Sequence, residues 1–435
     1  MGEAGDDPDG AALGALATAR AFLALPRDVL VLSAAMFGFS LGFQMTFRYL
    51  PEYLSVLGAG AVVIGAYKSF SDLIGAVYPY AGGVLSDRIG SRVSLTAFGV
   101  LSTLGFAIWW AAPTLRGWGI PAWSWVFVGF VLAQAWKSFG LGATFAVVKQ
   151  SVTPDRLATG FASTEVFRRV GFLLGPLLAA WVLAVVGPFE AGFRWVIVIA
   201  IGFGAVATIV QHWLYEADRD SFGRAFEGLQ TIRADLAGLP KPLQPLLMAD
   251  VFVRFANGMV YAFFVIVVVQ FLGVGFTGFG VSLAPASYFG VLLGLEMLVA
   301  LAVMVPASKL ARRTGLVPVV ATGFLVYAVF PVLLILAPAD QWVVAGLFAF
   351  SGLRFAGLPA HKALIVGPAE ADAGGRVTGS YYLVRNTLVI PSGLTGGWLY
   401  AMNPVWAFSA ASAVGLVGVA YFALKGREFD AYATG

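Results

Sequence analysis

Gly83-Val84-Leu85-Ser86-Asp87-Arg88-Ile89-Gly90-Ser91-Arg92 is a short charged turn between two long apolar runs, residues 61–85 and 93–112. Each run is long enough to cross a bilayer as a helix, which takes about 20 residues. Glycines permit a tight turn, and an acid with two arginines is tolerated in water or among headgroups but is costly in hydrocarbon. The stretch therefore predicts a polar hinge at a membrane face, after which the chain re-enters the membrane.

The composition of the whole chain is that of a membrane protein. Of its 435 residues, 59% are hydrophobic and 11% charged, and the mean hydropathy is +0.85, whereas soluble domains carry about 25% charged residues. Apolar segments cover residues 29–50, 61–85, 93–112, 122–148, 158–186, 193–215, 246–271, 286–306, 317–337, 342–366, 376–400 and 404–424. They are continuous and about twice as long as the alternating segments of a β-barrel. The sequence predicts an all-α membrane protein with twelve transmembrane helices.

Metal, redox and catalytic chemistry find no support in the residue types. The chain has no cysteine, and His212 and His361 lie far apart in the sequence without ligand partners at usable spacing. Walker-type phosphate loops, which would indicate direct use of ATP, do not occur. We therefore expect no cofactor, no metal and no enzymatic activity.

Basic residues in the connections predict the orientation. With the amino terminus in the cytoplasm, nearly all Lys and Arg of the connections fall on the cytoplasmic side, and the outer loops hold Arg116 and Arg194. Both termini are thus predicted to be cytoplasmic, in the cytoplasmic membrane. The same bias accounts for the net charge of +4 and the pI near 9.2, so no nucleic-acid partner is needed. The lack of Asn-x-Ser/Thr sequons fits a prokaryotic chain.

The two halves of the chain are predicted to be repeats. One ungapped offset aligns basic and aromatic residues within apolar segments, which chance rarely does. The aligned pairs include Lys137 with Arg354, Arg168 with Arg385, and Trp181 with Trp398. The predicted division is a cytoplasmic tail (1–27), a six-helix bundle (28–215), a cytoplasmic linker (216–243), a second bundle (244–424) and a tail (425–435). Apolar residues at helical spacing in the linker fit either an amphipathic surface helix or a plain tether.

The hinge resembles the signature between the second and third helices of the major facilitator superfamily, Gly-x-Leu-x-Asp-Arg-x-Gly-x-Arg. The matching residues are Gly83, Leu85, Asp87, Arg88, Gly90 and Arg92. Residues 308–315 are a decayed copy, with Arg312 where the acid should be. The resemblance implies two pseudo-symmetric six-helix bundles that move a small solute by alternating access. It also implies a gating latch, in which Asp87 meets the start of helix 11 while Arg88 and Arg92 engage acids of nearby loops.

Charges inside the predicted spans are confined to some helices. The resemblance implies that helices 3, 6, 9 and 12 face lipid, and their interiors carry no charge, as the cost of a charge in hydrocarbon requires. The charged residues in the interiors of the other spans are Lys68, Asp72, Lys137, Glu165, Arg168, Arg169, Asp250, Arg254, Glu296, Arg354 and Arg385. Bases outnumber acids among them, and a net positive cavity favours an anionic substrate.

These charges supply the candidate site residues. Lys137, Arg354 and Glu296 fall near the middle of their spans, where each needs a cavity or a counter-charge. The candidate substrate-binding residues are Lys137, Arg354, Arg254, Arg168 and Arg385. The candidates for proton coupling or for ion pairs are Asp72, Glu296, Glu165, Lys68 and Asp250. Pairs four residues apart on a helix can also neutralise each other, so purely structural ion pairs remain an alternative.

Helix 5 carries a second signal. Gly171-x-x-x-Gly175-Pro176 resembles the glycine-proline motif of the family's proton-coupled exporters, and it predicts close helix packing with a proline kink. Three functions stay open: a transporter of a small organic anion, a proton-coupled exporter of amphipathic compounds, and a non-transporting membrane receptor or scaffold. The expected partners are a small-molecule substrate, the lipid bilayer and, for an exporter, protons. A monomer is expected.

Overall fold

The first half of the chain forms one bundle of helices. The computed structural model describes residues 27–139, 157–215, 240–367 and 374–428. The elements of the first half are α2 (Arg27–Thr46), α3 (Leu50–Val56), α4 (Ala61–Ile89), α5 (Ser91–Ala111), η1 (Ala112–Trp118), α6 (Ala122–Gln134), η2 (Ala135–Phe139), α8 (Leu157–Val186) and α9 (Phe189–Leu214).

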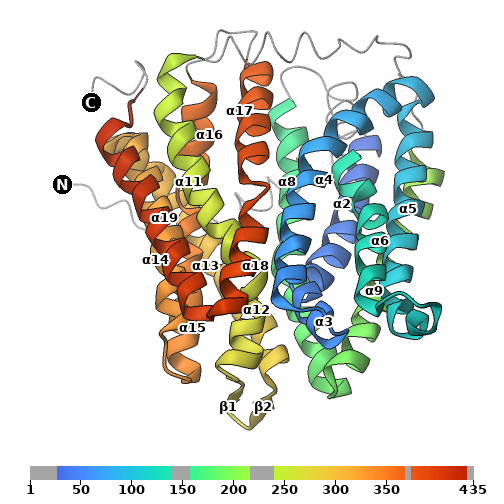
Figure 1. The fold of residues 1–435 in the computed structure, drawn as a ribbon. Helices are drawn as coiled ribbons and strands as arrows, with labels where there is room; N and C mark the ends of the chain where they lie inside the picture. Colours follow the sequence, from blue (N-terminus) through green and yellow to red (C-terminus); the bar gives the residue numbers. More distant parts are fainter. Residues whose placement is uncertain (1–26, 140–156, 216–239, 368–373, 429–435) are drawn as a thin grey trace.

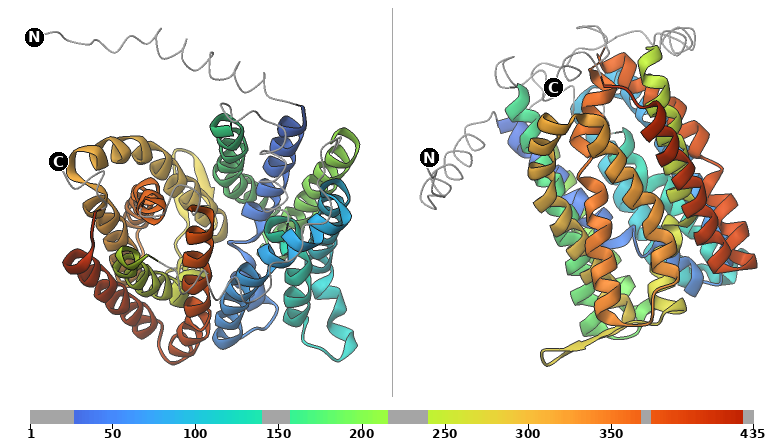
Figure 2. Two further views of the ribbon diagram at one scale, coloured as in Figure 1. Left: turned by 90° about the horizontal axis from the view of Figure 1, so that it is seen from above. Right: turned by 90° about the vertical axis from the view of Figure 1, so that its left-hand side faces the viewer.

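The second half forms a bundle beside the first, and the two lie side by side in Figure 1 and in the end-on view of Figure 2. Its elements up to the middle are η4 (Lys241–Leu243), α11 (Gln244–Val260), η5 (Tyr261–Phe263), α12 (Phe264–Ile266), η6 (Val267–Phe271), β1 (Phe276–Gly278), β2 (Val281–Leu283) and α13 (Pro285–Thr314). The remaining elements are α14 (Leu316–Ile335), α15 (Gln341–Gly352), η7 (Leu353–Phe355), α16 (Leu358–Val366), α17 (Gly374–Val389), α18 (Ser392–Met402) and α19 (Pro404–Lys425).

The predicted transmembrane segments are mainly helical where the structure describes them. Within the described ranges, nine helical segments are long and apolar enough to cross a membrane. The predicted segments 61–85, 122–148 and 376–400 hold α4, α6 with η2, and α17 with α18, respectively, although residues 140–148 lie outside the described part. The prediction of an all-α membrane fold is therefore confirmed.

Several predicted spans are interrupted, which hydropathy did not indicate. In the segment 29–50, α2 ends at Thr46, and after a turn the chain begins α3 at Leu50. The segment 246–271 passes through α11, η5, α12 and the π-helical η6, and 342–366 passes through α15, η7 and α16. Breaks of this kind often occur at functional sites. In the second half, the breaks place residues 261 and 353–355 in short 3-10 helices midway along the bundle.

The two halves turn in the same way at corresponding hinges. Gly90, between α4 and α5, has φ 86° and ψ 153°, and Gly315, between α13 and α14, has φ 91° and ψ 167°. Side chains with a β-carbon avoid this backbone region, so both positions require glycine. The match supports the internal repeat. We call this end of the molecule the hinge end, and the opposite end, which carries the β1–β2 hairpin, the hairpin end (Figure 1).

The halves meet through helices at the hairpin end. Across the interface α4 packs on α18 and α8 packs on α13. Gly65, Gly393 and Gly397 let the backbones of α4 and α18 touch, because a β-carbon added at Gly65 would lie 2.3 Å from the Gly393 carbonyl oxygen. The Tyr49 hydroxyl donates to the Ala286 carbonyl oxygen at 3.0 Å. The structure is therefore an arrangement in which the hairpin end is closed.

Candidate substrate-binding site

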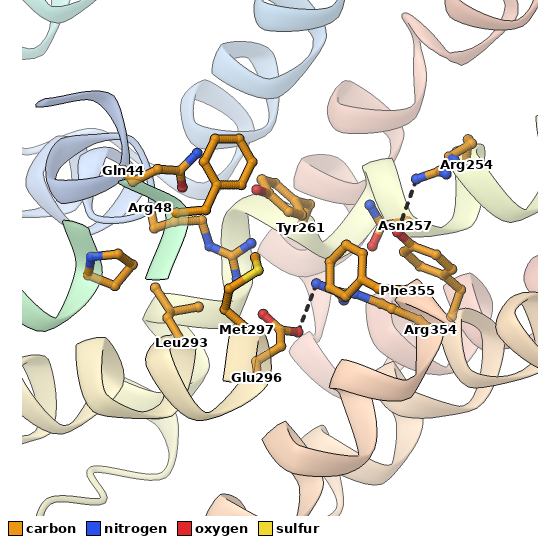
Figure 3. A pocket seen from close by; sticks show the side chains of 13 residues that line it. Gln44, Arg48, Arg254, Asn257, Tyr261, Leu293, Glu296, Met297, Arg354 and Phe355 are labelled. Carbon is orange, nitrogen blue, oxygen red and sulfur yellow. Dashed lines mark hydrogen bonds and ion pairs between the residues drawn. The ribbon is translucent and has the colours of Figure 1, made fainter. Parts of the chain in front are cut away.

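A cavity of about 250 Å³ lies between the two halves (Figure 3). The first half contributes the end of α2 and the middle of α8, and the second half contributes α11, η5, α13, α14 and η7. The lining residues are Gln44, Arg48, Phe172, Pro176, Arg254, Asn257, Tyr261, Leu293, Glu296, Met297, Tyr327, Arg354 and Phe355. A cavity of this size, just below the usual range for drug-sized ligands of about 300 to 1,000 Å³, suits a small solute.

Three arginines of the cavity rest on aromatic rings. The guanidinium carbon of Arg48 lies 4.5 Å from the ring centre of Tyr261, and that of Arg254 lies 4.9 Å from the ring centre of Tyr327. Arg354 lies 5.0 Å from the same Tyr327 ring. Stacking on a ring holds a guanidinium in place while its N–H groups still point outward in the plane. Such groups can bind a carboxylate through two parallel hydrogen bonds.

One acid faces these arginines. The Glu296 carboxylate forms an ion pair with Arg354 at 2.8 Å, and both side chains are almost fully buried. The hydroxyl of Ser351 donates a further hydrogen bond to the same carboxylate oxygen. Figure 3 shows Arg48 reaching toward Glu296 from the side opposite Arg354. The acid thus compensates Arg354, while Arg48 forms no ion pair with any residue that the structure describes.

Two guanidinium nitrogens in the cavity are buried donors that lack an acceptor. They are Nη2 of Arg48 and Nε of Arg354, and neither has a hydrogen-bond partner within the described part of the chain. Buried donors are nearly always paired, since leaving one unpaired costs about 1 to 3 kcal/mol or more for a charged group. The cavity therefore presents donors of positive charge to whatever occupies it.

The third arginine is tied to a buried cluster behind the cavity. Asp250 on α11 is fully buried, and its Oδ1 accepts a hydrogen bond from Nε of Arg254 at 3.2 Å. Its Oδ2 accepts from Arg385 at 3.1 Å and from the Tyr381 hydroxyl at 3.1 Å. His361 Nε2 lies 3.2 Å from the same oxygen. One carboxylate is thus shared by two arginines, so the cluster adds positive charge beside the cavity.

The structure gathers some of the predicted site residues and not others. Arg254, Glu296 and Arg354 line the cavity, and Arg385 lies behind it. Lys137 is not among the lining residues: its ammonium lies over the rings of Phe43 and Phe47 instead. The paired grip by Lys137 and Arg354 is therefore not formed in this arrangement. The side chains of Glu165 and Arg168 lie outside the described residues.

Lys68 and Asp72 form the ion pair that their spacing on α4 predicts. The pair sits on the helix that meets α18, so it belongs to the interface between the halves rather than to the cavity wall. Asp72 therefore has a cation of its own, as do Asp250 and Glu296.

Sequence reasoning missed Arg48. It lies at the end of the predicted span 29–50, where a basic residue is usually an anchor at the membrane surface. The chain instead turns after Thr46 and adds α3, which keeps Arg48 inside the protein. The signal available in the sequence was Pro51, which marks a break just after Arg48.

The hinge residues are described in part. The side chains of Asp87 and Arg88 lie outside the described residues. Arg92 was expected to engage an acid, but its Nε and Nη2 donate to the main-chain carbonyl oxygen of His212 at 3.0 and 2.7 Å. The last carbonyls of α9 lack partners within their helix and lie at its negative end, so they attract a guanidinium.

The glycines of α8 allow close packing on α2. A β-carbon added at Gly171 would lie 2.7 Å from Cβ of Ser40, and one added at Gly175 would lie 2.7 Å from Cβ of Gln44. Pro176, one residue on, lines the cavity. The motif thus holds α8 tightly against α2, which ends two residues before Arg48. Within the described part of the chain, no cluster of three or more histidine and acidic side chains is arranged to hold a metal ion.

Comparison with known families fits this geometry. A family model described as the Major Facilitator Superfamily matches residues 99–386. The chain belongs to the Major Facilitator Superfamily. This confirms the family that the hinge resembles. Because the family consists of secondary transporters, the expectation of a transporter rather than an enzyme is also confirmed.

Two relatives of the Major Facilitator Superfamily match the chain over different lengths. An uncharacterized MFS-type transporter of Methanocaldococcus jannaschii is 21% identical over 394 residues, which are 90% of this chain and 93% of the relative. A putative uncharacterized MFS-type transporter of Mycobacterium tuberculosis is 30% identical over 200 residues, 46% of this chain and 43% of that protein.

Solved structures show the same fold. A mutant of the nucleoside transporter NupG aligns with a TM-score of 0.71 at 13% identity, covering 92% of this chain and 98% of that one. A mutant of the peptide transporter POT in complex with sulfate aligns with a TM-score of 0.72 at 14% identity, covering 92% and 95%. At these identities the likeness concerns the fold of this multi-pass membrane protein.

Proposed function

We propose that this secondary transporter binds a small organic anion in the cavity between its halves and carries it across the membrane by alternating access. The observation that carries the proposal is Arg48, a guanidinium in the cavity that has a buried unpaired donor and forms no ion pair with any described residue, since the nearby Glu296 is paired with Arg354. An anionic group placed beside Arg48 would accept a hydrogen bond from the unpaired N–H and compensate the charge of the guanidinium.

The surroundings of Arg48 support this substrate class. Arg254 shares the Asp250 carboxylate with Arg385, so among the described residues the cavity and the cluster behind it carry more positive than negative charge. Aromatic rings of Tyr261, Tyr327 and Phe355 line the remaining wall, which suits the apolar body of an organic acid. The low-dielectric walls strengthen the attraction for an anion.

We place the hinge end in the cytoplasm. Among the described residues, the hinge end carries Arg92, Arg312 and Arg313, whereas Arg194 lies toward the hairpin end. This distribution follows the rule that basic residues stay on the cytoplasmic side. The structure then corresponds to the arrangement that is closed toward the outside, and the protein resides in the cytoplasmic membrane as a monomer.

A ligand screen with one substitution tests the binding site. The purified protein is heated with a panel of small carboxylates, sulfonates and phosphate esters, and with neutral sugars and lipophilic cations as the other classes. We expect one or more organic anions to raise the unfolding temperature, because a ligand that binds the folded state stabilises it by mass action.

Arg48→Gln should remove that stabilisation, since Arg48 supplies the unpaired donor. Arg194→Gln is the matched control, because Arg194 also stacks on a ring, that of Trp110, but lies away from the cavity. It should keep the wild-type response. Stabilisation by lipophilic cations alone, or an anion response that survives Arg48→Gln, would overturn the proposal and favour an exporter of amphipathic compounds.

A further inference from the structure

Glu52 differs from the acids that lie inside the described spans. It lies in α3, beyond the predicted span 29–50, and is 4% exposed. Asp72, Asp250 and Glu296 each form an ion pair with a lysine or an arginine. Glu52 forms none with any described residue, and its described partner is an amide. A buried carboxylate without a cation is costly to keep ionised, so it favours the protonated form.

The contact of Glu52 joins the two halves. The side-chain amide of Gln270, on η6 of the second half, donates to Oε1 of Glu52 at 3.0 Å and to Oε2 at 2.9 Å. The same amide donates to the hydroxyl of Ser55 at 3.1 Å. α3 lies at the hairpin end (Figure 1), and η6 leads into β1 of the hairpin, so the contact is at the end where the halves meet. Separation of the halves would therefore break this contact and expose the carboxyl to water.

We propose that Glu52 is a proton-binding site that couples closure of the hairpin end to protonation: the carboxyl holds a proton while Gln270 covers it and releases the proton to water when the halves separate. This inference rests on the proposed alternating-access function. It adds the proton as the coupled ion and assigns it to a residue other than the ion-paired acids Asp72, Asp250 and Glu296.

The sign of the pH effect follows from the closed geometry. Burial raises the pKa of the Glu52 carboxyl above its usual range, and the hydrogen bonds from Gln270 offset part of this rise. Water would restore the ordinary pKa when the end opens. The closed arrangement thus binds more protons than the open one, so falling pH favours closure and rising pH through the raised pKa favours opening.

One further titratable group of the described chain acts on this carboxyl. Tyr400 on α18 lies close enough for its charge to interact with that of Glu52. A tyrosine phenol ordinarily titrates near pH 10 and is neutral near pH 7. Of the two groups, Glu52 is therefore the one that changes its protonation at the lower pH.

The distance between the halves at the hairpin end provides a readout that needs no substrate. The chain has no native cysteine, so nitroxide labels can be attached to Ile120→Cys in the first half and Leu336→Cys in the second. Both positions are exposed. Electron paramagnetic resonance of the full-length protein in liposomes then reports the label distance between pH 4 and pH 9.

In the otherwise native chain, short distances should dominate at low pH and a longer population should grow as the pH rises. Glu52→Gln mimics the protonated side chain, so short distances should dominate at every pH. Glu190→Gln, at a partly exposed acid of α9, is the matched control and should keep the native pH dependence. A pH dependence that persists in Glu52→Gln, or its absence from the native chain, would overturn the proposal.

Gln270→Lys provides a second, independent variant. An ammonium beside Glu52 favours the ionised carboxylate, so the midpoint of the pH transition should fall by about one unit or more. An unchanged midpoint would contradict the assignment to Glu52. Because no ligand is present, a failure here is distinct from a failure of the anion site, which the thermal screen with Arg48→Gln reports.

Discussion

At the scale of single residues, the environment of each charge decides its role. Asp250 accepts from Arg254 and Arg385, whereas Glu52 accepts from the amide of Gln270. The first carboxylate holds buried cations in place. The second holds none, so its ionisation opposes the closed arrangement rather than supporting it.

Asp250→Asn should destabilise the protein strongly. The change removes the negative charge between two buried or half-buried arginines, and breaking a buried pair in this way costs about 3 to 5 kcal/mol. Thermal unfolding of the detergent-solubilised protein measures the loss. Glu52→Gln is the comparison: it strands no cation, and its expected effect is at most about 1 kcal/mol. Equal losses for the two variants would contradict this distinction.

Sequence reasoning found only part of the site at this scale. Arg254, Glu296 and Arg354 were recognised because a charge near the middle of an apolar span has no route to water. Arg48 and Glu52 were not, because residues at the end of a span reach the membrane surface in an ordinary helix. Burying them requires α3, whose packing depends on distant residues such as Gln270.

At the scale of secondary structure, hydropathy located the spans but not their breaks. An apolar run has the same mean hydropathy whether it forms one α-helix or passes through π and 3-10 turns. The segment 246–271 is broken near Tyr261, which lines the cavity. The two hinges, by contrast, could be predicted from the sequence, since Gly90 and Gly315 both adopt a backbone conformation that favours glycine.

Gly65→Leu should open the hairpin end without unfolding either half. The backbone of α18 fills the space beside Gly65, with the Gly397 Cα only 2.7 Å from an added β-carbon. A leucine there cannot fit unless α4 and α18 separate. The Ile120 and Leu336 label pair should then report longer distances at all pH values.

Gly75→Leu is the matched control, because a β-carbon at Gly75 on the same helix meets nothing within 4 Å among the described atoms. Its distance distribution should equal that of the labelled parent. If Gly65→Leu also keeps the short distances, the contact between α4 and α18 does not hold the end closed.

At the scale of the whole molecule, the orientation in the membrane was predicted from charge alone. Thiol labelling in intact cells tests it, since the chain has no native cysteine. Leu336→Cys, at the hairpin end, should react with a membrane-impermeant maleimide from outside. Thr314→Cys, next to the hinge glycine Gly315, should react only after the cells are permeabilised. The opposite pattern would reverse the orientation.

The twelve-segment pattern and the family could be predicted from the sequence, because length, hydropathy and the hinge motif are local properties. The cavity could not, because it forms between halves whose contacts join residues far apart in the chain, such as Tyr49 with Ala286. The substrate class is harder still to predict from the sequence, since it depends on which charges in the cavity remain without a counter-charge once the halves meet.

The most direct test of the central claim is counterflow in proteoliposomes. Vesicles are loaded with an unlabelled organic anion identified by the thermal screen, and the entry of the same radiolabelled anion is followed. We predict that the label accumulates transiently with the native chain and not with Arg48→Gln, while Arg194→Gln behaves as the native chain does. Equal counterflow by Arg48→Gln, or exchange of lipophilic cations but of no anion, would contradict the account.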